Sequence, residues 1–105
     1  MTKERVRYIY RLKPGAGEEY DRVHLNVAPE LLKLISEVGI TNYTIWRHEE
    51  IVVCEFDAAQ GFEKTSKLSA ASAAQQAWTA KILHLFDQID SNGEPLWLRE
   101  VFRLD

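Results

Sequence analysis

The chain has 105 residues, of which 46% are hydrophobic and 28% are charged, and its formal net charge is −3 at pH 7. This length suits one domain spanning residues 1–105 with a single core, and the composition is that of a folded globular protein. A slightly acidic chain without a basic run is a poor ligand for nucleic acid or an anionic membrane, so we expect neither as a partner. Nothing resembles a membrane span or a signal peptide, and we expect a cytoplasmic protein.

Metal and nucleotide chemistry have no local signature in this sequence. The glycines are scattered through turns, so there is no glycine-rich phosphate loop. A single cysteine cannot form a disulfide within the chain, and no two histidines have the close spacing of metal ligands. The residues concerned are Cys54, His24, His48 and His84. We therefore expect no metal ion and no cofactor.

Residues 5–12 have the alternation of a β-strand, and residues 13–17 end it with a turn that contains proline and glycine. The side chains expected on the apolar face are Val6, Tyr8, Tyr10 and Leu12. A helix is expected to follow from Glu18, with apolar residues at spacings of three and four as far as Val38, and to stop at Gly39. Pro29 lies inside this pattern, and it should kink the helix or divide it near Ala28.

Residues 40–48 and 51–57 are rich in β-branched and aromatic residues, and they predict a β-hairpin. Tyr43 and Ile45 should share one face of its first strand, and Asn42, Thr44 and Trp46 the other.

The rest of the chain predicts two helices and a final strand. A short helix is expected from Ala58 to Leu68 and a longer one from Ala71 to Ile89. Residues 90–93 should end the second helix, and the final strand is expected from Pro95 to Leu104.

The predicted order is β-α-β-β-α-α-β, which is the split βαβ arrangement of the ferredoxin-like α+β fold. Such an antiparallel sheet carries helices on one face only, so the other face needs cover. Four large aromatic side chains would otherwise meet water: Tyr8, Tyr10, Trp46 and Trp97. We therefore expect a homodimer in which the open sheet faces pack together, with Trp97 at the contact.

Tyr20 and His24 are four residues apart on the predicted helix, so they should lie on one face. A single histidine on an apolar stripe is commonly a hydrogen-bonded core residue. Tyrosine and histidine together also provide a proton donor and acceptor near neutral pH, as general acid–base catalysis requires. The residues alone leave both interpretations open, whereas His48 and His84 are expected in solvent and Cys54 in the core.

Several short motifs together resemble the L-rhamnose mutarotase family over nearly the whole chain. They are E-E-Y-x-x-x-H at Glu18–His24, H-x-x-x-x-P-E at His24–Glu30, N-Y-x-I at Asn42–Ile45, Q-x-x-W at Gln75–Trp78 and E-V-F-x-L at Glu100–Leu104. The resemblance implies a dimeric α+β barrel of ferredoxin-like units. It also implies an isomerase that interconverts the α and β anomers of a free monosaccharide without cofactor or metal.

The same resemblance implies roles for individual residues. His24 matches the family's proton donor, while Tyr20, Tyr43 and Trp78 match residues that contact the sugar. Two aromatic positions of the family are replaced by Ala28 and Ala77, which leaves the particular sugar open. Two other classes remain as alternatives: a non-catalytic protein that binds a sugar or metabolite, and a cofactor-free monooxygenase or carrier with an apolar pocket.

Overall fold

Strand β1 (Glu4–Leu12) lies at the centre of the sheet. The computed structural model describes residues 3–87 and 94–105. In it, β1 pairs antiparallel with β3 (Ile51–Ala58), and β3 pairs antiparallel with the edge strand β2 (Ile40–His48). The short strands β4 (Phe86–Asp87) and β5 (Leu96–Trp97) lie on the other side of β1, giving the order β2-β3-β1-β4 with β5 also on β1. The predicted ferredoxin-like α+β fold with an antiparallel sheet is confirmed.

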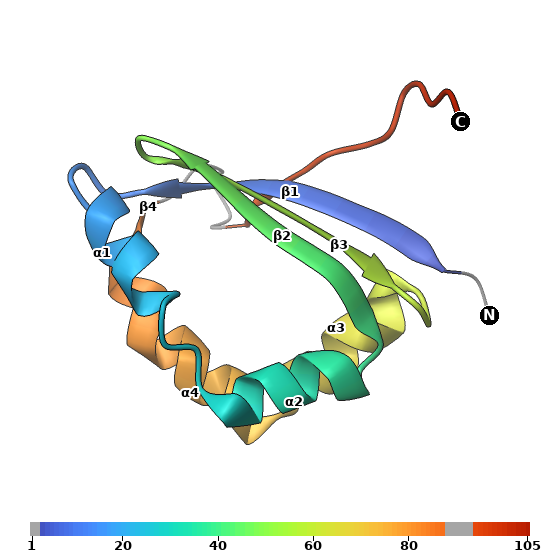
Figure 1. Ribbon diagram of the computed structural model, residues 1–105, viewed down its shortest axis with the longest axis horizontal. Coiled ribbons are helices and arrows are strands. Elements are labelled where there is room, and N and C mark those ends of the chain that lie inside the picture. Colours follow the sequence, from blue (N-terminus) through green and yellow to red (C-terminus); the bar gives the residue numbers. More distant parts are fainter. Residues whose placement is uncertain (1–2, 88–93) are drawn as a thin grey trace.

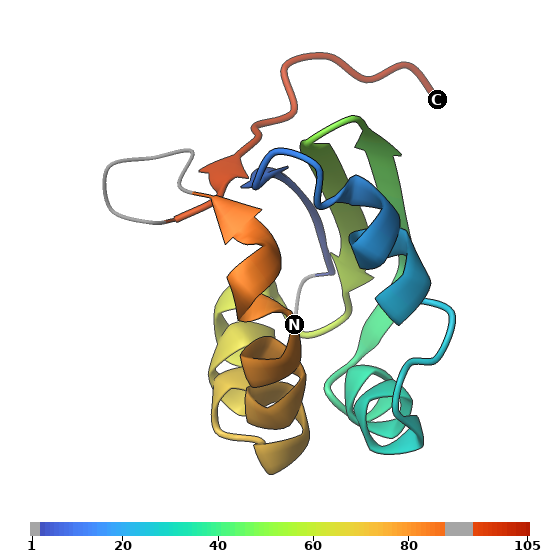
Figure 2. The same cartoon turned by 90° about the vertical axis from the view of Figure 1, so that its left-hand side faces the viewer.

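The alternation of β1 determines which face of the sheet becomes the core. The helices all lie on one side of the sheet (Figures 1 and 2). Val6, Tyr8 and Leu12 are buried in the core, and Tyr8 lines the cavity between the sheet and the helices. Val52, Cys54 and the other even-numbered residues of β3 are buried on the same side, because successive side chains of a strand alternate between faces. The core thus forms between the sheet and one layer of helices.

The long helix expected after β1 is two helices, α1 (Gly17–Val23) and α2 (Pro29–Glu37). Pro29 occupies the first turn of α2, where its missing N–H costs no helical hydrogen bond. The prediction that Pro29 divides the helix near Ala28 is therefore confirmed. The helical segment ends before Gly39, whose φ of 83° is readily adopted only by glycine.

The next two helices differ in their bounds from the prediction. Helix α3 (Phe62–Ala70) begins later than predicted, because β3 continues to Ala58 and Gly61 then turns with a φ of 87°. Helix α4 (Ala73–Ile82) begins at Ser72, whose hydroxyl accepts a hydrogen bond from Ala74 N at 3.2 Å.

The predicted helix from Ala71 to Ile89 is too long. Beyond α4 the chain forms a 3₁₀ turn, η1 (Leu83–Leu85), and then enters the sheet as β4. Phe86 therefore pairs with Leu12 in the sheet, although the periodic pattern predicts that Phe86 belongs to the helix. The predicted helix end at Ile89 and the turn at residues 90–93 lie outside the described residues.

The final strand is much shorter than the predicted Pro95–Leu104. Only Leu96 and Trp97 pair with β1, and Leu98 N then donates to Arg7 O at 2.9 Å. Residues 98–105, called the tail below, extend away from the body of the molecule (Figure 1). In the tail, Val101, Phe102 and Leu104 are 85%, 79% and 86% exposed. The strand-like pattern is present there, but none of the described strands pairs with residues 98–105.

Of the aromatic side chains Tyr8, Tyr10, Trp46 and Trp97, three lie on the helix-covered face. Tyr8 lies opposite Trp97 in the sheet, and both side chains, like that of Tyr10, line the space between sheet and helices. Trp46 lies on the open face and is 62% exposed. The apolar face predicted for β1, with Tyr8 and Tyr10, is therefore the helix-covered face, and the register of β5 turns Trp97 to the same side.

The open face carries two carboxylates within a network of donors. Glu55 accepts hydrogen bonds from Arg7 Nε at 2.8 Å, Thr44 Oγ1 at 3.2 Å and Trp46 Nε1 at 3.3 Å. Opposite charges and hydrogen-bonding groups on neighbouring strands contribute cross-strand pairs that stabilise the sheet.

Asp57 is only 3% exposed and depends on this network. It accepts a hydrogen bond from Asn42 Nδ2 at 2.8 Å, and it lies 3.5 Å from Arg5 Nη1 and 3.6 Å from Lys3 Nζ. The hydrogen bond from Asn42, and then the charges of Lys3 and Arg5, hold the pKa of Asp57 below its usual value.

We predict that Asp57 makes the fold sensitive to acid. Because its folded-state pKa is lowered, its contribution is complete above the usual value of 3.8 and is lost as the pH falls through the folded value. Replacement by alanine, which also leaves Asn42 without its acceptor, should lower the free energy of unfolding at pH 7 by about 1–3 kcal/mol. Urea unfolding at several pH values measures this. Glu63→Ala, at an exposed carboxylate on α3, is the control and should change little; an equal effect of both substitutions would contradict the prediction.

Candidate active site

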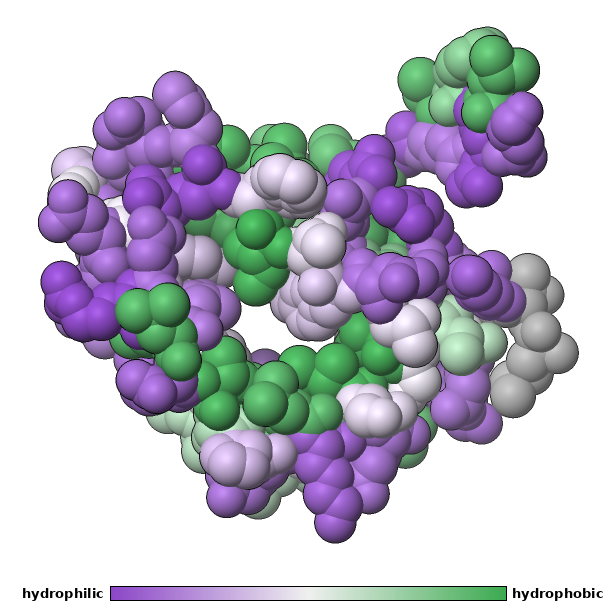
Figure 3. Space-filling view, in the orientation of Figure 1, coloured by the Kyte–Doolittle hydropathy of each residue, from purple (hydrophilic) through white to green (hydrophobic). Residues whose placement is uncertain are grey.

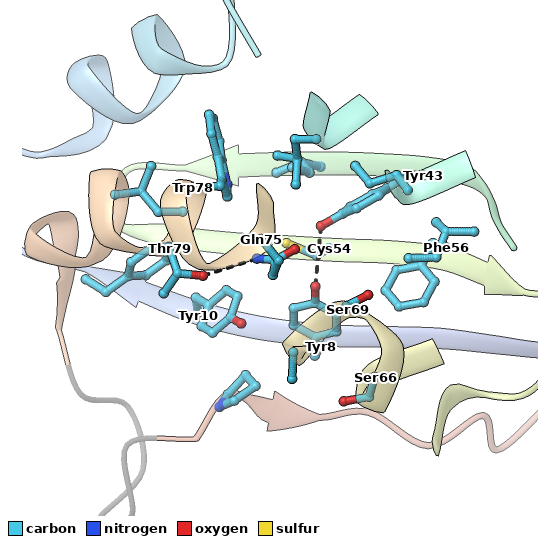
Figure 4. Close-up of a pocket in the computed structure, with 18 of the residues that line it drawn as sticks. Tyr8, Tyr10, Tyr43, Cys54, Phe56, Ser66, Ser69, Gln75, Trp78 and Thr79 are labelled. Atoms are coloured by element: carbon cyan, nitrogen blue, oxygen red, sulfur yellow. Dashed lines mark hydrogen bonds between the residues drawn. The ribbon is translucent and has the colours of Figure 1, made fainter. Parts of the chain in front are cut away.

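One cavity of about 840 Å³ lies between the inner face of the sheet and the helices. Figure 3 shows it as a hollow beneath the strands, and Figure 4 shows the side chains that enter it. All four residues that the sequence predicted for the site, Tyr20, His24, Tyr43 and Trp78, line this cavity. They come from three elements, α1, β2 and α4, so the fold brings them together from distant parts of the chain.

Helix α1 presents Tyr20 and His24 side by side. Their ring centroids are 4.3 Å apart, and Tyr20 is only 4% exposed. His24 follows the last helical residue, and its Nδ1 lies 2.7 Å from the carbonyl oxygen of Tyr20. A carbonyl oxygen can only accept, so Nδ1 carries the proton in this contact. His24 is thereby left with Nε2 as the ring nitrogen that can exchange a proton with a ligand.

Trp78 from α4 packs against the histidine from the opposite side. Its ring centroid is 5.3 Å from that of His24, with an angle of 84° between the two planes. Such an edge-to-face contact is favourable, and it fixes the orientation of both rings. His24 is therefore held between a phenol and an indole at one end of the cavity.

Tyr43 reaches the cavity through a β-bulge in β2. Thr41 lies opposite Asp57, but Thr44 already lies opposite Glu55, so β2 contains one extra residue, and Asn42 has a φ of 52°. The Tyr43 hydroxyl lies 3.5 Å from that of Tyr8 (Figure 4). The predicted alternation, with Tyr43 and Ile45 on the cavity side, is observed.

Sequence reasoning missed several residues that line the cavity. Tyr8, Tyr10 and Cys54 form its floor on β1 and β3, and Gln75 and Thr79 on α4 form part of its wall (Figure 4). Gln75 Nε2 donates to Thr79 Oγ1 at 3.1 Å. The alternation of β1 and β3 was a signal that the floor residues point inward, but no local pattern shows that the helices leave a cavity above them.

Further aromatic and polar side chains also line this cavity. Trp97 packs on Tyr8 with ring centroids 5.0 Å apart, so it belongs to the cavity rather than to the predicted dimer contact. Two exposed carboxylates, Asp87 and Glu94, line the end near β4 and β5. Ser66 and Ser69 contribute hydroxyls from α3.

The remaining predicted residues lie where their surroundings explain them. His48 is exposed, and His84 is exposed with its Nε2 3.7 Å from Glu19 Oε2. Cys54 is 2% exposed, as expected of a core residue. Ala28 and Ala77 are exposed, and neither is among the residues that line the cavity within the described part of the chain.

Among residues 3–87 and 94–105, no group of three or more histidine, cysteine, aspartate or glutamate side chains is placed to hold a metal ion. The helices described there are also too short or too polar to cross a membrane.

Burial keeps the phenols of the cavity protonated. Burial raises the pKa of Tyr8, Tyr10 and Tyr20 well above the usual value of 10.0, and the nearby tyrosine and cysteine groups raise them further. It raises the pKa of Tyr43 to about 12, although that residue is 38% exposed overall. Burial also raises the pKa of the Cys54 thiol to about 11. At neutral pH these groups therefore act as hydrogen-bond donors and not as bases or nucleophiles.

We predict that tyrosine ionisation in the folded protein lies above its usual range. The chain has four tyrosines, and burial raises the pKa of every one, so a titration followed by tyrosinate absorbance should show little change until the pH passes the usual value of 10.0. Because the raised values favour the neutral form in the fold, stability should fall as the pH rises above 10.0. Titration in denaturant is the control and should return to the usual value; ionisation of even one tyrosine near 10.0 in the folded protein would contradict the prediction.

These features define a small α+β domain of ferredoxin-like type, with an aromatic, hydroxyl-bearing cavity under its sheet and a histidine at one end. The sequence model of the L-rhamnose mutarotase family matches residues 5–104. The chain belongs to the L-rhamnose mutarotase family, and the enzymes of this family are isomerases that interconvert sugar anomers.

Two relatives illustrate the similarity along the whole sequence. L-rhamnose mutarotase of Flavobacterium johnsoniae is 32% identical over 104 residues, which covers 93% of this chain and 92% of the relative. L-rhamnose mutarotase of Bacteroides thetaiotaomicron is 30% identical over 95 residues, covering 90% and 91%.

The fold is shared with solved structures. The crystal structure of an L-rhamnose mutarotase from Formosa agariphila superposes with a TM-score of 0.76 at 22% identity, covering 97% of this chain and 99% of the other. A NIPSNAP domain protein from Burkholderia xenovorans superposes with a TM-score of 0.63 at 18% identity, covering 99% and 100%. At these identities, the likeness shows a common fold.

Proposed function

We propose that this protein is a mutarotase for a free aldose, L-rhamnose or a related deoxy sugar, and that it works without a cofactor. The observation that carries the proposal is the arrangement around His24. Its Nδ1 is engaged by the Tyr20 carbonyl at 2.7 Å, while its Nε2 is left for a ligand in a cavity that Tyr43 and Trp78 also line. Membership of the mutarotase family supports this assignment.

The chemistry requires two proton movements. A proton is delivered to the ring oxygen as the bond from that oxygen to the anomeric carbon breaks, and the anomeric hydroxyl loses a proton to give the open aldehyde. Rotation about one carbon–carbon bond and reclosure then yield the other anomer, with no net gain or loss of protons. We assign the proton delivered to the ring oxygen to His24 Nε2, because Nδ1 is engaged by the Tyr20 carbonyl and the imidazole lines the cavity.

The remaining predicted residues bind the sugar in this proposal. Tyr20 and Tyr43 keep their protons, so their hydroxyls donate hydrogen bonds to sugar oxygens. The apolar ring of Trp78 stacks on the face of the sugar that carries its C–H groups. The same ring packs against the His24 imidazole, with the two ring centroids 5.3 Å apart. A positioned proton transfer accelerates a reaction by about 10²- to 10⁴-fold, which suits a reaction that already proceeds in water.

The two alternative functions are less well supported. Aromatic and aliphatic side chains such as Phe56, Phe62 and Leu31 line much of the cavity, which a carrier or monooxygenase for an apolar ligand would also use. Family membership favours mutarotation over both alternatives, and so does His24, whose Nε2 makes no hydrogen bond to the described residues.

We predict that His24→Ala lowers catalysed anomer exchange by about 10²- to 10⁴-fold, because it removes the proton carrier. Polarimetry or NMR saturation transfer on L-rhamnose and a panel of other aldoses measures the rate. His48→Ala, at an exposed histidine of β2, is the matched control and should retain wild-type activity. An aldose that exchanges equally fast with wild type and His24→Ala would remove His24 from the mechanism, and the absence of acceleration for every aldose would overturn the proposed function.

The finer expectations on partners and location also belong to this proposal. We propose a cytoplasmic homodimer without nucleic-acid or membrane partners. Two unpartnered surfaces support the dimer. One is the helix-free face of the sheet, and the other is the tail, with Val101, Phe102 and Leu104 at 79% to 86% exposure (Figures 1 and 3). A second copy would cover both at once, because exposed apolar groups of this size are usually buried against a partner.

We predict that the protein is a dimer in solution and that deletion of residues 99–105 weakens the dimer by at least tenfold in dissociation constant. The reason is the loss of the apolar contact surface of the tail. Size-exclusion chromatography with light scattering at several concentrations measures this. Leu25→Ser, at a leucine that is 80% exposed between α1 and α2, is the control and should leave the dimer unchanged. A monomeric full-length chain would contradict the dimer, and an unchanged dimer after the deletion would exclude the tail from it.

A further inference from the structure

Helix α1 carries both Tyr20 and His24, yet it is only seven residues long and lies between two irregular connections, residues 13–16 and 24–28. A helix this short has little stability of its own, so side-chain contacts must fix its position. On the inside, Tyr20 anchors it in the core. Val23 also packs against the core. Apolar contacts of this kind hold the helix on the core, and a directed polar contact elsewhere on α1 can define its rotation, and hence the place of His24, more sharply.

The contact on the outer side is a salt bridge to β2. Arg47 Nε donates to Asp21 Oδ1 at 2.8 Å, and Arg47 Nη2 donates to Asp21 Oδ2 at 2.6 Å. The planar guanidinium therefore binds the carboxylate with two parallel hydrogen bonds, which fix the orientation of the two groups as well as the distance between them. Its third nitrogen, Nη1, donates to Glu49 O at 2.8 Å, so the guanidinium is itself held by the turn after β2.

The first turn of α1 is shaped to receive this arginine. A Cβ at Gly17 would lie 2.4 Å from Arg47 Nη1 and 3.2 Å from Glu49 O, so only a glycine fits here without displacing the guanidinium. Gly17, Asp21 and His24 have the spacing i, i+4 and i+7, which places them along one side of the helix. The rotation that brings Asp21 to Arg47 therefore also sets the direction of His24.

A smaller cavity of about 510 Å³ adjoins these groups. Tyr20, Asp21, His24, Ile45 and Arg47 line it, so the salt bridge and the histidine border one space at the mouth of the site. The other charged contact of α1 is weaker in geometry: His84 Nε2 lies 3.7 Å from Glu19 Oε2, as a single contact between half-exposed groups. Within the described residues, the Arg47–Asp21 pair is the two-point charged contact that joins α1 to the sheet.

We propose that Arg47 is a positioning residue for the reaction. Its salt bridge to Asp21 and its contact with Gly17 fix α1 against β2, and this fixes the position of the His24 imidazole in the cavity. The kinetic part of this inference rests on the proposed function. The side chains of Arg47 and Asp21 are 25% and 55% exposed, so solvent reaches the pair, and ion pairs open to solvent add little to stability. Its effect should therefore be seen in catalysis more than in unfolding.

The kinetic test compares Arg47→Lys and Asp21→Asn with Glu19→Gln. The last substitution removes a carboxylate from the same helix but leaves the Arg47–Asp21 salt bridge intact. Lysine keeps the charge of residue 47 but cannot bind a carboxylate with two parallel hydrogen bonds. Arg47→Lys and Asp21→Asn should each lower kcat by about 10- to 100-fold, because small displacements of a catalytic group greatly slow the reaction. KM should change by less than about threefold, since Tyr43 and Trp78 lie on other elements and Tyr20, although it lies on α1, is anchored in the core. Wild-type kcat in Arg47→Lys, or a loss matched by Glu19→Gln, would overturn the proposal.

A second pair of variants tests the packing on Gly17. Gly17→Ala should lower kcat in the same way, because the new methyl group displaces the guanidinium. In an Arg47→Ala background the guanidinium is absent and only Glu49 O, at 3.2 Å, lies close to the new methyl group, so Gly17→Ala should then cause little further loss. Additive losses in the double variant would show that Gly17 acts independently of Arg47, contrary to the proposal.

A measurement without substrate separates this inference from the proposed function. The carbon–proton NMR signal of the His24 imidazole should shift in Arg47→Lys and Asp21→Asn but stay in place in Glu19→Gln, with unfolding temperatures unchanged within about 3 °C. If wild type exchanges no sugar but this pattern is observed, the positioning role stands and the proposed function falls. An unshifted His24 signal in Arg47→Lys overturns the positioning role, whatever the enzyme does.

Discussion

The antiparallel register of β1 and β3 is the constraint on which the rest of the structure depends. It runs from Glu4 opposite Ala58 to Arg11 opposite Ile51, and a slip by one residue would exchange the two faces of the sheet. In the observed register, Tyr8 and Cys54 lie opposite each other on the inner face, and Glu55 joins Arg7 on the outer face. The floor of the cavity and the charged network outside are therefore two sides of one pairing.

Where sequence periodicity reported on burial alone, it predicted this arrangement well. The alternation of residues 5–12 identified the inner face of β1, and Pro29 marked the division between α1 and α2. The spacing of Tyr20 and His24 placed both on one helical face, and family resemblance added Tyr43 and Trp78, which line the same cavity. These predictions succeeded because each rests on geometry repeated within a few residues.

The predictions that failed depend on contacts between distant segments. Phe86 continues a helical pattern in sequence, but pairing with Leu12 takes it into the sheet and shortens the helix. Trp97 lies inside because it pairs opposite Tyr8, and no pattern near Trp97 reports that register. The cavity itself could not be predicted either, since it depends on how far α1 and α4 stand from the strands.

Burial determines which groups of the cavity stay protonated. Its phenols and the Cys54 thiol keep their protons at neutral pH, because burial disfavours their charged forms. That leaves them to orient a ligand. His24 also lines the cavity, and the carbonyl of Tyr20 engages one of its two ring nitrogens. If His24 is the acid, as we propose, the rotation of this short helix determines where its other nitrogen points, and the Arg47–Asp21 contact on the same side of α1 then serves the reacting atom. In this proposal the buried tyrosines keep the walls of the site protonated, and the salt bridge orients the acid.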